Sequence, residues 1–127
     1  MAKITGKIKS TRMTDTIHCF DRFIKYFQDP KTHEPNVEEE NYPAYIQGQI
    51  YIARMYSKLI PTSTAPAAAQ IAENLSKGLA RYEDVCKFSS TRKLQGMEME
   101  IDMCKQMAEL LPRKISELQY SLLFSNK

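Results

Sequence analysis

The sequence is poor in glycine and has neither a long hydrophobic run nor an N-terminal signal. Only four glycines occur among its 127 residues, whereas strand-rich folds with many tight turns usually need more, so helices are favoured. No apolar stretch approaches the roughly 20 residues of a membrane-spanning helix, and the N-terminus lacks the apolar core of a signal peptide. The chain is therefore expected to form one all-α domain over residues 1–127, without a membrane partner.

Residues that usually carry catalysis or bind metals are also scarce. The chain has three cysteines, an odd number without a CxxC pair, so we expect no zinc site and reduced thiols in the cytosol. Its two histidines lack partners at metal-ligand spacing: His18 borders an apolar helix face, and His33 lies in a polar loop. Glycine-rich nucleotide-binding loops, HExxH and GxSxG are absent. The sequence predicts no catalytic residue, no metal and no cofactor.

Charge gives little indication of a partner. The 18 basic and 15 acidic residues give a net charge of +3, which is too mild for a nucleic-acid-binding protein with a concentrated basic patch. Basic residues near the N-terminus are interpreted as a solvated helix start, with a phosphate-binding arm as the alternative. The acidic run Glu38–Glu40 is interpreted as solvated or helix-start charge, with a metal or a basic partner as the alternative.

Apolar residues recur every three or four positions through most of the chain, as they do on amphipathic helices. In the first segment the steps are four, three, four and three, along Met13, Ile17, Phe20, Ile24 and Phe27. Asp29-Pro30 ends this helix because a residue before proline disfavours the α conformation. Pro112 is expected to kink or restart the last helix. The expected helices span about 5–28, 43–60, 66–88, 91–111 and 112–124, with loops at 31–41 and 61–65.

The expected helix 43–60 is apolar over most of its circumference and must therefore be covered on several sides. One polar stripe is the only face available to solvent or to a partner, and it is the candidate partner-binding site: Gln47, Tyr51, Arg54 and Lys58. Two interpretations of Arg54 remain open. It forms an ion pair with Glu73 or Glu83 of the next helix, or it contacts an acidic partner surface, since Arg and Tyr are enriched among interface anchors.

The second and third expected helices form an antiparallel pair similar to a tetratricopeptide (TPR) unit. Ala53 followed by Tyr56 is placed where such a pair brings its first helix close, and Gly78 followed by Tyr82 has the matching place on the second. The spacing between these pairs is longer than the standard unit permits. We therefore expect a TPR-like architecture, as an antiparallel helical bundle or an α-solenoid fragment of four to five helices.

Methionines are concentrated in the last helical segment. Met97 and Met107 lie on or next to its core stripe, whereas Met99 and Met103 lie four apart on another face. Flexible thioethers fill irregular gaps in a core and also suit adaptable binding surfaces. Core filling is the favoured interpretation, and cover by a neighbouring domain or a partner is the alternative.

Four segments of the sequence resemble the C-terminal region of the KIF-binding protein family. "IYIARMYSKLI" is similar to that family's "ARLY-x-K-I-I" helix, and "AENLSKGLARYEDVCKF" to its "ENL…SL…Y…VDYC" helix. "MEIDMCKQMAELLPRKISEL" resembles its closing segment, including the proline at Pro112, and "FDRFIKYFQDP" resembles the helix that precedes them. The resemblance covers about residues 13–118, with the four segments in the same order and at similar spacing.

The resemblance implies a helical, non-catalytic regulator that binds kinesin motor domains and blocks their attachment to microtubules, in the cytoplasm and associated with the cytoskeleton. Family members are several times longer, so this chain is expected to be a fragment or a short relative of them. The alternative function is a structural helical-repeat scaffold that completes a longer solenoid, or a self-association module, with no direct motor contact. A small enzyme is the least favoured hypothesis.

Overall fold

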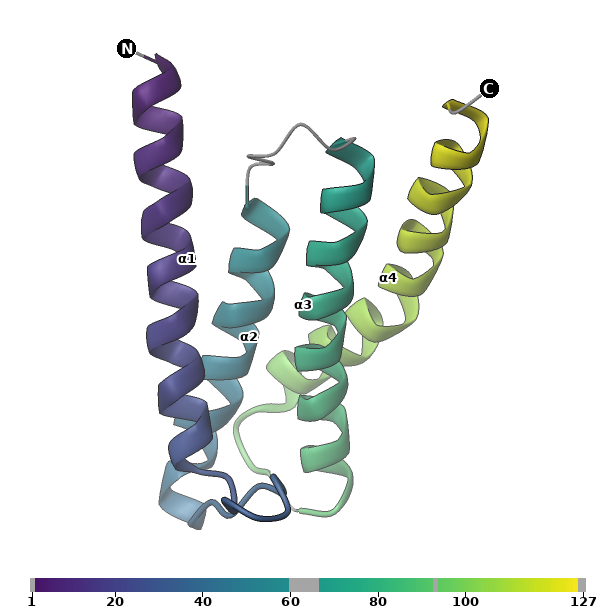
Figure 1. The fold of residues 1–127 in the computed structure, drawn as a ribbon. Helices are drawn as coiled ribbons and strands as arrows, with labels where there is room; N and C mark the ends of the chain where they lie inside the picture. Colours follow the sequence, from purple (N-terminus) through teal and green to yellow (C-terminus); the bar gives the residue numbers. More distant parts are fainter. Residues whose placement is uncertain (1, 60–66, 93, 126–127) are drawn as a thin grey trace.

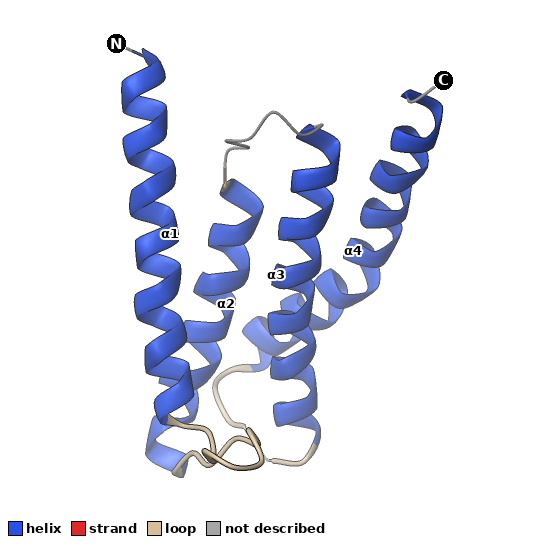
Figure 2. Cartoon of the chain, in the orientation of Figure 1, coloured by secondary structure: helices blue, strands red, loops and turns tan. Residues whose placement is uncertain are grey.

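The structure, a computed structural model, describes residues 2–59, 67–92 and 94–125, and it is an antiparallel bundle of helices (Figure 1). The helices are α1 (Ala2–Tyr26), the short 3-10 helix η1 (Glu39–Asn41), α2 (Tyr42–Lys58), α3 (Ala67–Ser90) and α4 (Glu98–Ser125). Successive long helices lie side by side and alternate in direction (Figure 1). No strand occurs in these described ranges (Figure 2). The predicted all-α class is confirmed.

The first three predicted helices agree with α1, α2 and α3 to within three residues at each end. The loop predicted at 61–65 lies outside the described residues. The prediction of separate helices at 91–111 and 112–124 is wrong, because α4 begins at Glu98 and continues through Pro112. Thr91, Arg92 and residues 94–97 instead lie outside the helices, with Gly96 at a φ of 81°, a conformation that glycine adopts without steric cost.

Pro112 is tolerated inside α4 because the residues around it are fixed against α3. Leu111 and Ile115 are buried on either side of the proline, and their packing offsets the missing backbone hydrogen bond. The axis of α4 changes direction along its length (Figure 1), and a proline within a helix is a common cause of such a bend. The kink predicted from Pro112 therefore describes this helix better than a restart.

The core is arranged around α2, which lies between α1 and α3. Seven of its 17 residues are buried: Tyr45, Ile46, Gly48, Gln49, Ile50, Ile52 and Ala53. The predicted apolar face of α1 is confirmed at its three innermost positions, Ile17, Ile24 and Phe27. A helix that is apolar over most of its surface needs cover on several sides, and α1 and α3 provide it.

The predicted close approach of α2 and α3 is present at Ala53 and Gly78. A Cβ atom added to Gly78 would lie 3.1 Å from the backbone oxygen of Ala53. The absence of a side chain at Gly78 lets the two helices approach at this level, and Tyr82, one turn further along α3, is buried next to it. This contact supports the TPR-like arrangement of the pair.

The loop between α1 and η1 folds back on itself. The carboxylate of Asp29 accepts hydrogen bonds from the backbone N–H groups of Lys31 and Thr32, at 2.8 and 3.1 Å. The backbone N–H of Asn36 donates to the carbonyl of Phe27 at 2.6 Å, which closes the loop. His33 is exposed at the tip of this turn, as predicted. The loop thereby brings residues 33–35 against the end of α3.

Candidate partner-binding surface

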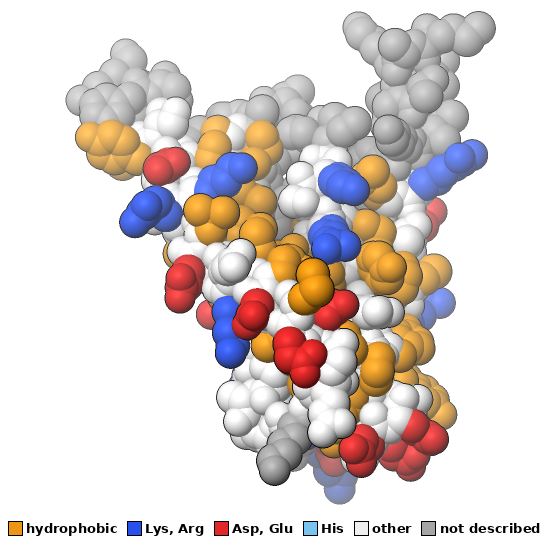
Figure 3. Space-filling model, turned by 180° about the vertical axis from the view of Figure 1, so that it is seen from behind, with side chains coloured by type: hydrophobic (Ala, Val, Ile, Leu, Met, Phe, Trp, Pro, Cys, Tyr) orange, Lys and Arg blue, Asp and Glu red, His pale blue; other side chains and the backbone are white. Residues whose placement is uncertain are grey.

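The four predicted site residues lie together on the solvent-facing side of α2. Gln47, Tyr51, Arg54 and Lys58 are all exposed, and steps of four, three and four keep them on one helix face. In the view from behind, hydrophobic side chains form a broken band, and near its centre basic side chains lie above acidic ones (Figure 3). The structure thus brings the predicted residues together on one surface.

The α1 side of this surface is aromatic. The rings of Tyr51 and Phe20 are 5.8 Å apart, and Tyr51 remains 48 % exposed. Phe23, 41 % exposed, lies over Gly48. A Cβ atom at Gly48 would come within 2.9 Å of the Ile24 side chain, so glycine allows α1 to approach α2 here. We call Phe20, Phe23 and Tyr51 the aromatic patch. Neither phenylalanine was among the predicted partner-binding residues.

The other side of the surface carries the Arg54 guanidinium, which faces α3 and α4. Burial raises the pKa of Tyr82 and raises that of Cys104 to about 12, and the nearby positive charge of Arg54 opposes both increases. Arg54 therefore lies close to side chains of both helices. The first interpretation, an ion pair of Arg54 with Glu73 or Glu83, is not found among the described residues. Glu73 pairs instead with Lys77 of its own helix, at 3.5 Å. Arg54 remains exposed for an external contact.

A polar network inside the bundle holds the three helices behind this surface. Arg81 of α3 donates to a carboxylate oxygen of Asp21 on α1 at 2.6 Å and to the amide oxygen of Gln49 on α2 at 3.2 Å. Gln49 is fully buried and donates in turn to the hydroxyl of Tyr45 at 3.3 Å. A buried amide is stabilised only when it is hydrogen-bonded. These bonds therefore fix the register of α1, α2 and α3 relative to one another.

Asp21 carries its charge within this network. Burial raises the pKa of its carboxyl, but the hydrogen bonds and charges of Arg81 and Lys25 outweigh this effect and hold the pKa below its ordinary value. Lys25 lies 3.3 Å from the second carboxylate oxygen. Sequence periodicity does not reveal this network. The available signal was Gln49, which the spacing of its neighbours Tyr45, Ile46 and Ile50 places within the apolar surface of α2.

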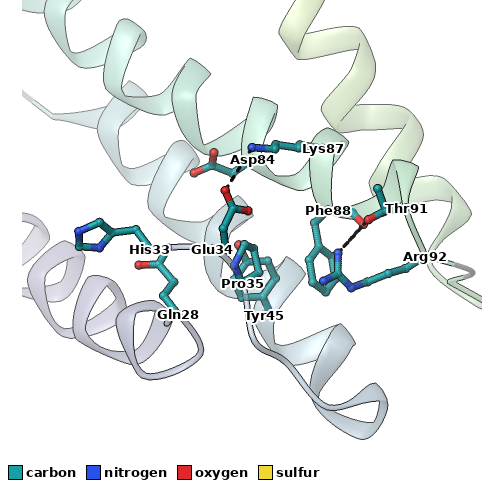
Figure 4. A pocket seen from close by; sticks show the side chains of 10 residues that line it. All are labelled: Gln28, His33, Glu34, Pro35, Tyr45, Asp84, Lys87, Phe88, Thr91 and Arg92. Atoms are coloured by element: carbon teal, nitrogen blue, oxygen red, sulfur yellow. Dashed lines mark hydrogen bonds and ion pairs between the residues drawn. The ribbon is translucent and has the colours of Figure 1, made fainter. Parts of the chain in front are cut away.

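A separate hollow of about 240 Å³ lies at the opposite end of the bundle, between the α1–η1 loop and α3 (Figure 4). Glu34 of the loop points toward Lys87 of α3, 3.8 Å away, and the Arg92 guanidinium lies 4.1 Å from the centre of the Phe88 ring. Desolvation raises the pKa of Asp84 at its edge, although the residue as a whole is exposed. Its lining residues are Gln28, His33, Glu34, Pro35, Tyr45, Asp84, Lys87, Phe88, Thr91 and Arg92.

Charges of both signs in this hollow contact each other across it, so its contacts attach the loop to the end of α3. Two of its lining groups, the Asp84 carboxyl and the Tyr45 hydroxyl, have raised pKa values because of desolvation. Within the described parts of the chain, no three His, Cys, Asp or Glu side chains are grouped closely enough to hold a metal ion. Nor is any described helix both long and apolar enough to cross a membrane.

Comparison with known proteins gives consistent matches. The family described as "KIF-1 binding protein C terminal" matches residues 2–118. KIF-binding protein of Xenopus tropicalis is 30% identical over 120 residues, and that of Mus musculus is 26% identical over 119 residues. Each alignment covers 91% of this chain and 18% of the relative, so the chain spans less than a fifth of their length. No solved structure matches.

Proposed function

Because the chain belongs to the family of the KIF-1 binding protein C-terminal region, we propose that it is a non-catalytic protein-binding module that contacts kinesin motor domains and blocks their attachment to microtubules. The exposed face of α2 is the surface proposed for this contact. It combines the aromatic patch with two basic side chains, Arg54 and Lys58. The observation that carries the proposal is that Tyr51, Arg54 and Lys58 are exposed together on the closely packed helix α2. Phe20 and Phe23 of the neighbouring α1 lie beside them.

The composition of this surface suits a protein partner. Aromatic and arginine side chains provide large contact areas and are frequent among residues that dominate binding energy. The aromatic patch would bury an apolar stripe of the partner, and Arg54 and Lys58 would face its acidic residues. A helix of the motor domain laid along α2 meets both requirements, since an amphipathic helix presents such a stripe with charges beside it.

The rigidity of the surface supports the same proposal. The residues on the reverse side of α2 are fixed by Gly78 and by the Arg81–Gln49 hydrogen bond. A surface that is already ordered loses little conformational entropy on binding. The motor domain would then be blocked sterically, because a bound helical module on its surface excludes the microtubule. In longer chains, further TPR-like helices would share the contact, and the activity would be exercised in the cytoplasm, beside the cytoskeleton.

The proposal is tested by retention of the chain on an immobilised kinesin motor domain and by landing of that motor on microtubules. Retention and reduced landing are expected for the wild type. Arg54→Glu and Tyr51→Ala should each weaken retention by about tenfold or more. Arg22→Glu is the matched control, since Arg22 is an exposed arginine on α1 and makes the same charge change.

Two results would contradict different parts of the proposal. A wild-type chain that is neither retained nor able to reduce landing would exclude motor binding by this module. Retention that falls equally for Arg54→Glu and Arg22→Glu would instead exclude the α2 face as the site, since only a general charge effect would remain. Unchanged helical circular dichroism in each variant separates lost binding from lost folding.

A further inference from the structure

The outer face of α4 carries a second, separate surface. The helix packs on α3 through its buried residues Cys104, Leu111 and Ile115, and the opposite side is open. Met99 is 84 % exposed and Leu110 is 55 % exposed on that side. The residues Met99, Gln106, Leu110 and Arg113 follow one another at steps of seven, four and three, which places them on one stripe of the helix.

The centre of this stripe is a shallow hollow of about 370 Å³ on α4 itself. It is lined by Gln106, Glu109, Leu110 and Arg113. The exposed Leu110 thus lies beside an acid, Glu109, and a base, Arg113, which are themselves one helical turn apart. Neither Glu109 nor Arg113 belongs to an ion pair with any other residue that the structure describes.

The arrangement of these charges is complementary to itself. Glu109 and Arg113 lie two positions before and two positions after residue 111. A two-fold axis beside residue 111 therefore sets Glu109 of each copy opposite Arg113 of the other when the helices run antiparallel. The same axis brings the two Leu110 side chains together at the hollow. Closed two-fold pairing of identical surfaces is the commonest form of self-association among soluble proteins.

We propose that the outer face of α4 binds a second copy of this chain, with the two α4 helices antiparallel and Leu110 at the centre. Two symmetric ion pairs between Glu109 and Arg113 set the register, and contact between the leucines excludes water. A partner surface of one charge sign could pair with either Glu109 or Arg113 but not with both. A second copy offers an opposite charge to each of them. The inference concerns a different face from the proposed motor site and stands independently of it.

Analytical ultracentrifugation of the full chain over a wide concentration range tests the proposal. The wild-type mass should rise from that of the monomer toward that of the dimer. Arg113→Glu sets four acidic groups against one another, and Glu109→Arg sets four basic groups against one another. Each single variant should weaken dimer formation by about tenfold or more, because like charges placed opposite each other are strongly unfavourable.

Mixing the two single variants is the most specific test of the proposed ion pairs. A heterodimer of Arg113→Glu with Glu109→Arg has opposite charges at both contacts, so the mixture should associate although neither variant does so alone. Arg22→Glu is the control, since it makes the same charge change at an exposed position on α1, away from α4. It should dimerise as the wild type does.

The proposal is overturned by a wild-type chain that stays monomeric at every concentration. It is also overturned if Arg113→Glu dimerises as well as Arg22→Glu, or if the mixture of single variants stays monomeric while the wild type associates. All substituted side chains are exposed, and circular dichroism checks that each variant retains its helices.

Discussion

Helices α2 and α4 are both rich in apolar residues, yet they use them differently. The 17-residue α2 lies between two neighbours and buries seven residues. The 28-residue α4 lies at the edge of the bundle, and among its described side chains only Cys104, Leu111 and Ile115 are buried (Figure 1). The number of neighbouring helices, rather than hydrophobic content, decides whether an apolar side chain becomes core or surface.

The largest expected difference is between alanine substitutions in the two helices. Ile46 of α2 is fully buried, so Ile46→Ala should lower the free energy of unfolding by about 3 kcal/mol through lost burial and a residual cavity. Leu110→Ala on α4 should change it by less than about 0.5 kcal/mol, because that side chain is already exposed. Urea unfolding of dilute, monomeric protein measures both. Equal losses at the two positions would refute the contrast between the helices.

The next effect concerns the contact that places α2 against α3. Gly78→Leu should lower the free energy of unfolding by about 2–3 kcal/mol, because its Cβ atom alone would lie 3.1 Å from the Ala53 carbonyl oxygen. Backbone atoms cannot rotate aside as a flexible side chain can. Ala80→Leu introduces the same side chain at an exposed position of the same helix and should be nearly neutral. Similar thermal stabilities for the two variants would show that α2 and α3 are not tightly apposed.

Sequence periodicity was sufficient for most of the fold. The helix face containing Ile17, Ile24 and Phe27 and the buried stripe of α2 follow from steps of three and four, because helix geometry is local and each buried face repeats it. The exposure of Gln47, Tyr51, Arg54 and Lys58 follows from the same rule. These predictions succeeded because no information from distant parts of the chain was needed.

The failures depend on contacts between distant residues. Arg81 lies 32 residues from Gln49 and 60 from Asp21, so their network exists only after three helices have assembled. Pro112 indicated a possible helix break, whereas α4 continues through it with Leu111 and Ile115 buried on either side. One of the two interpretations of Arg54, an ion pair with Glu73 or Glu83, is not found among the described residues. Glu73 pairs instead with Lys77, four residues along the same helix.

The polar network should have a smaller effect than the apolar core, with a dependence on pH. Arg81→Met should lower the free energy of unfolding by about 2 kcal/mol at neutral pH, because the buried amide oxygen of Gln49 loses its donor and Asp21 loses its partner. The folded-state pKa of Asp21 lies below its ordinary value of 3.8. The stabilisation from its charge is therefore complete above 3.8 and is lost as the pH falls through the lower folded-state pKa.

The stability difference between Arg81→Met and the wild type should accordingly shrink as the pH falls from neutral to roughly 3. Urea unfolding at several pH values measures this change. Asp15→Asn removes an exposed carboxylate from α1 and should leave the neutral-pH stability nearly unchanged. A difference between Arg81→Met and wild type that is independent of pH would mean that Asp21 does not contribute through its charge.

Chemical labelling of the three thiols perturbs the protein least, since it needs no substitution. It reports how tightly α4 packs on α3. Cys19 is exposed, Cys86 is half-buried, and Cys104 is buried between α4 and α3. Burial raises the pKa of the Cys104 thiol to about 12, so about one molecule in 10,000 carries the reactive thiolate at pH 8. A thiol-specific disulfide reagent should modify Cys19 first, Cys86 more slowly, and Cys104 only when urea unfolds the chain. Mass spectrometry of digested protein assigns each site.

Rapid modification of Cys104 in the folded protein would contradict this prediction. It would show that α4 separates readily from α3, and it would weaken the contrast between the exposed outer side and the buried inner side of α4.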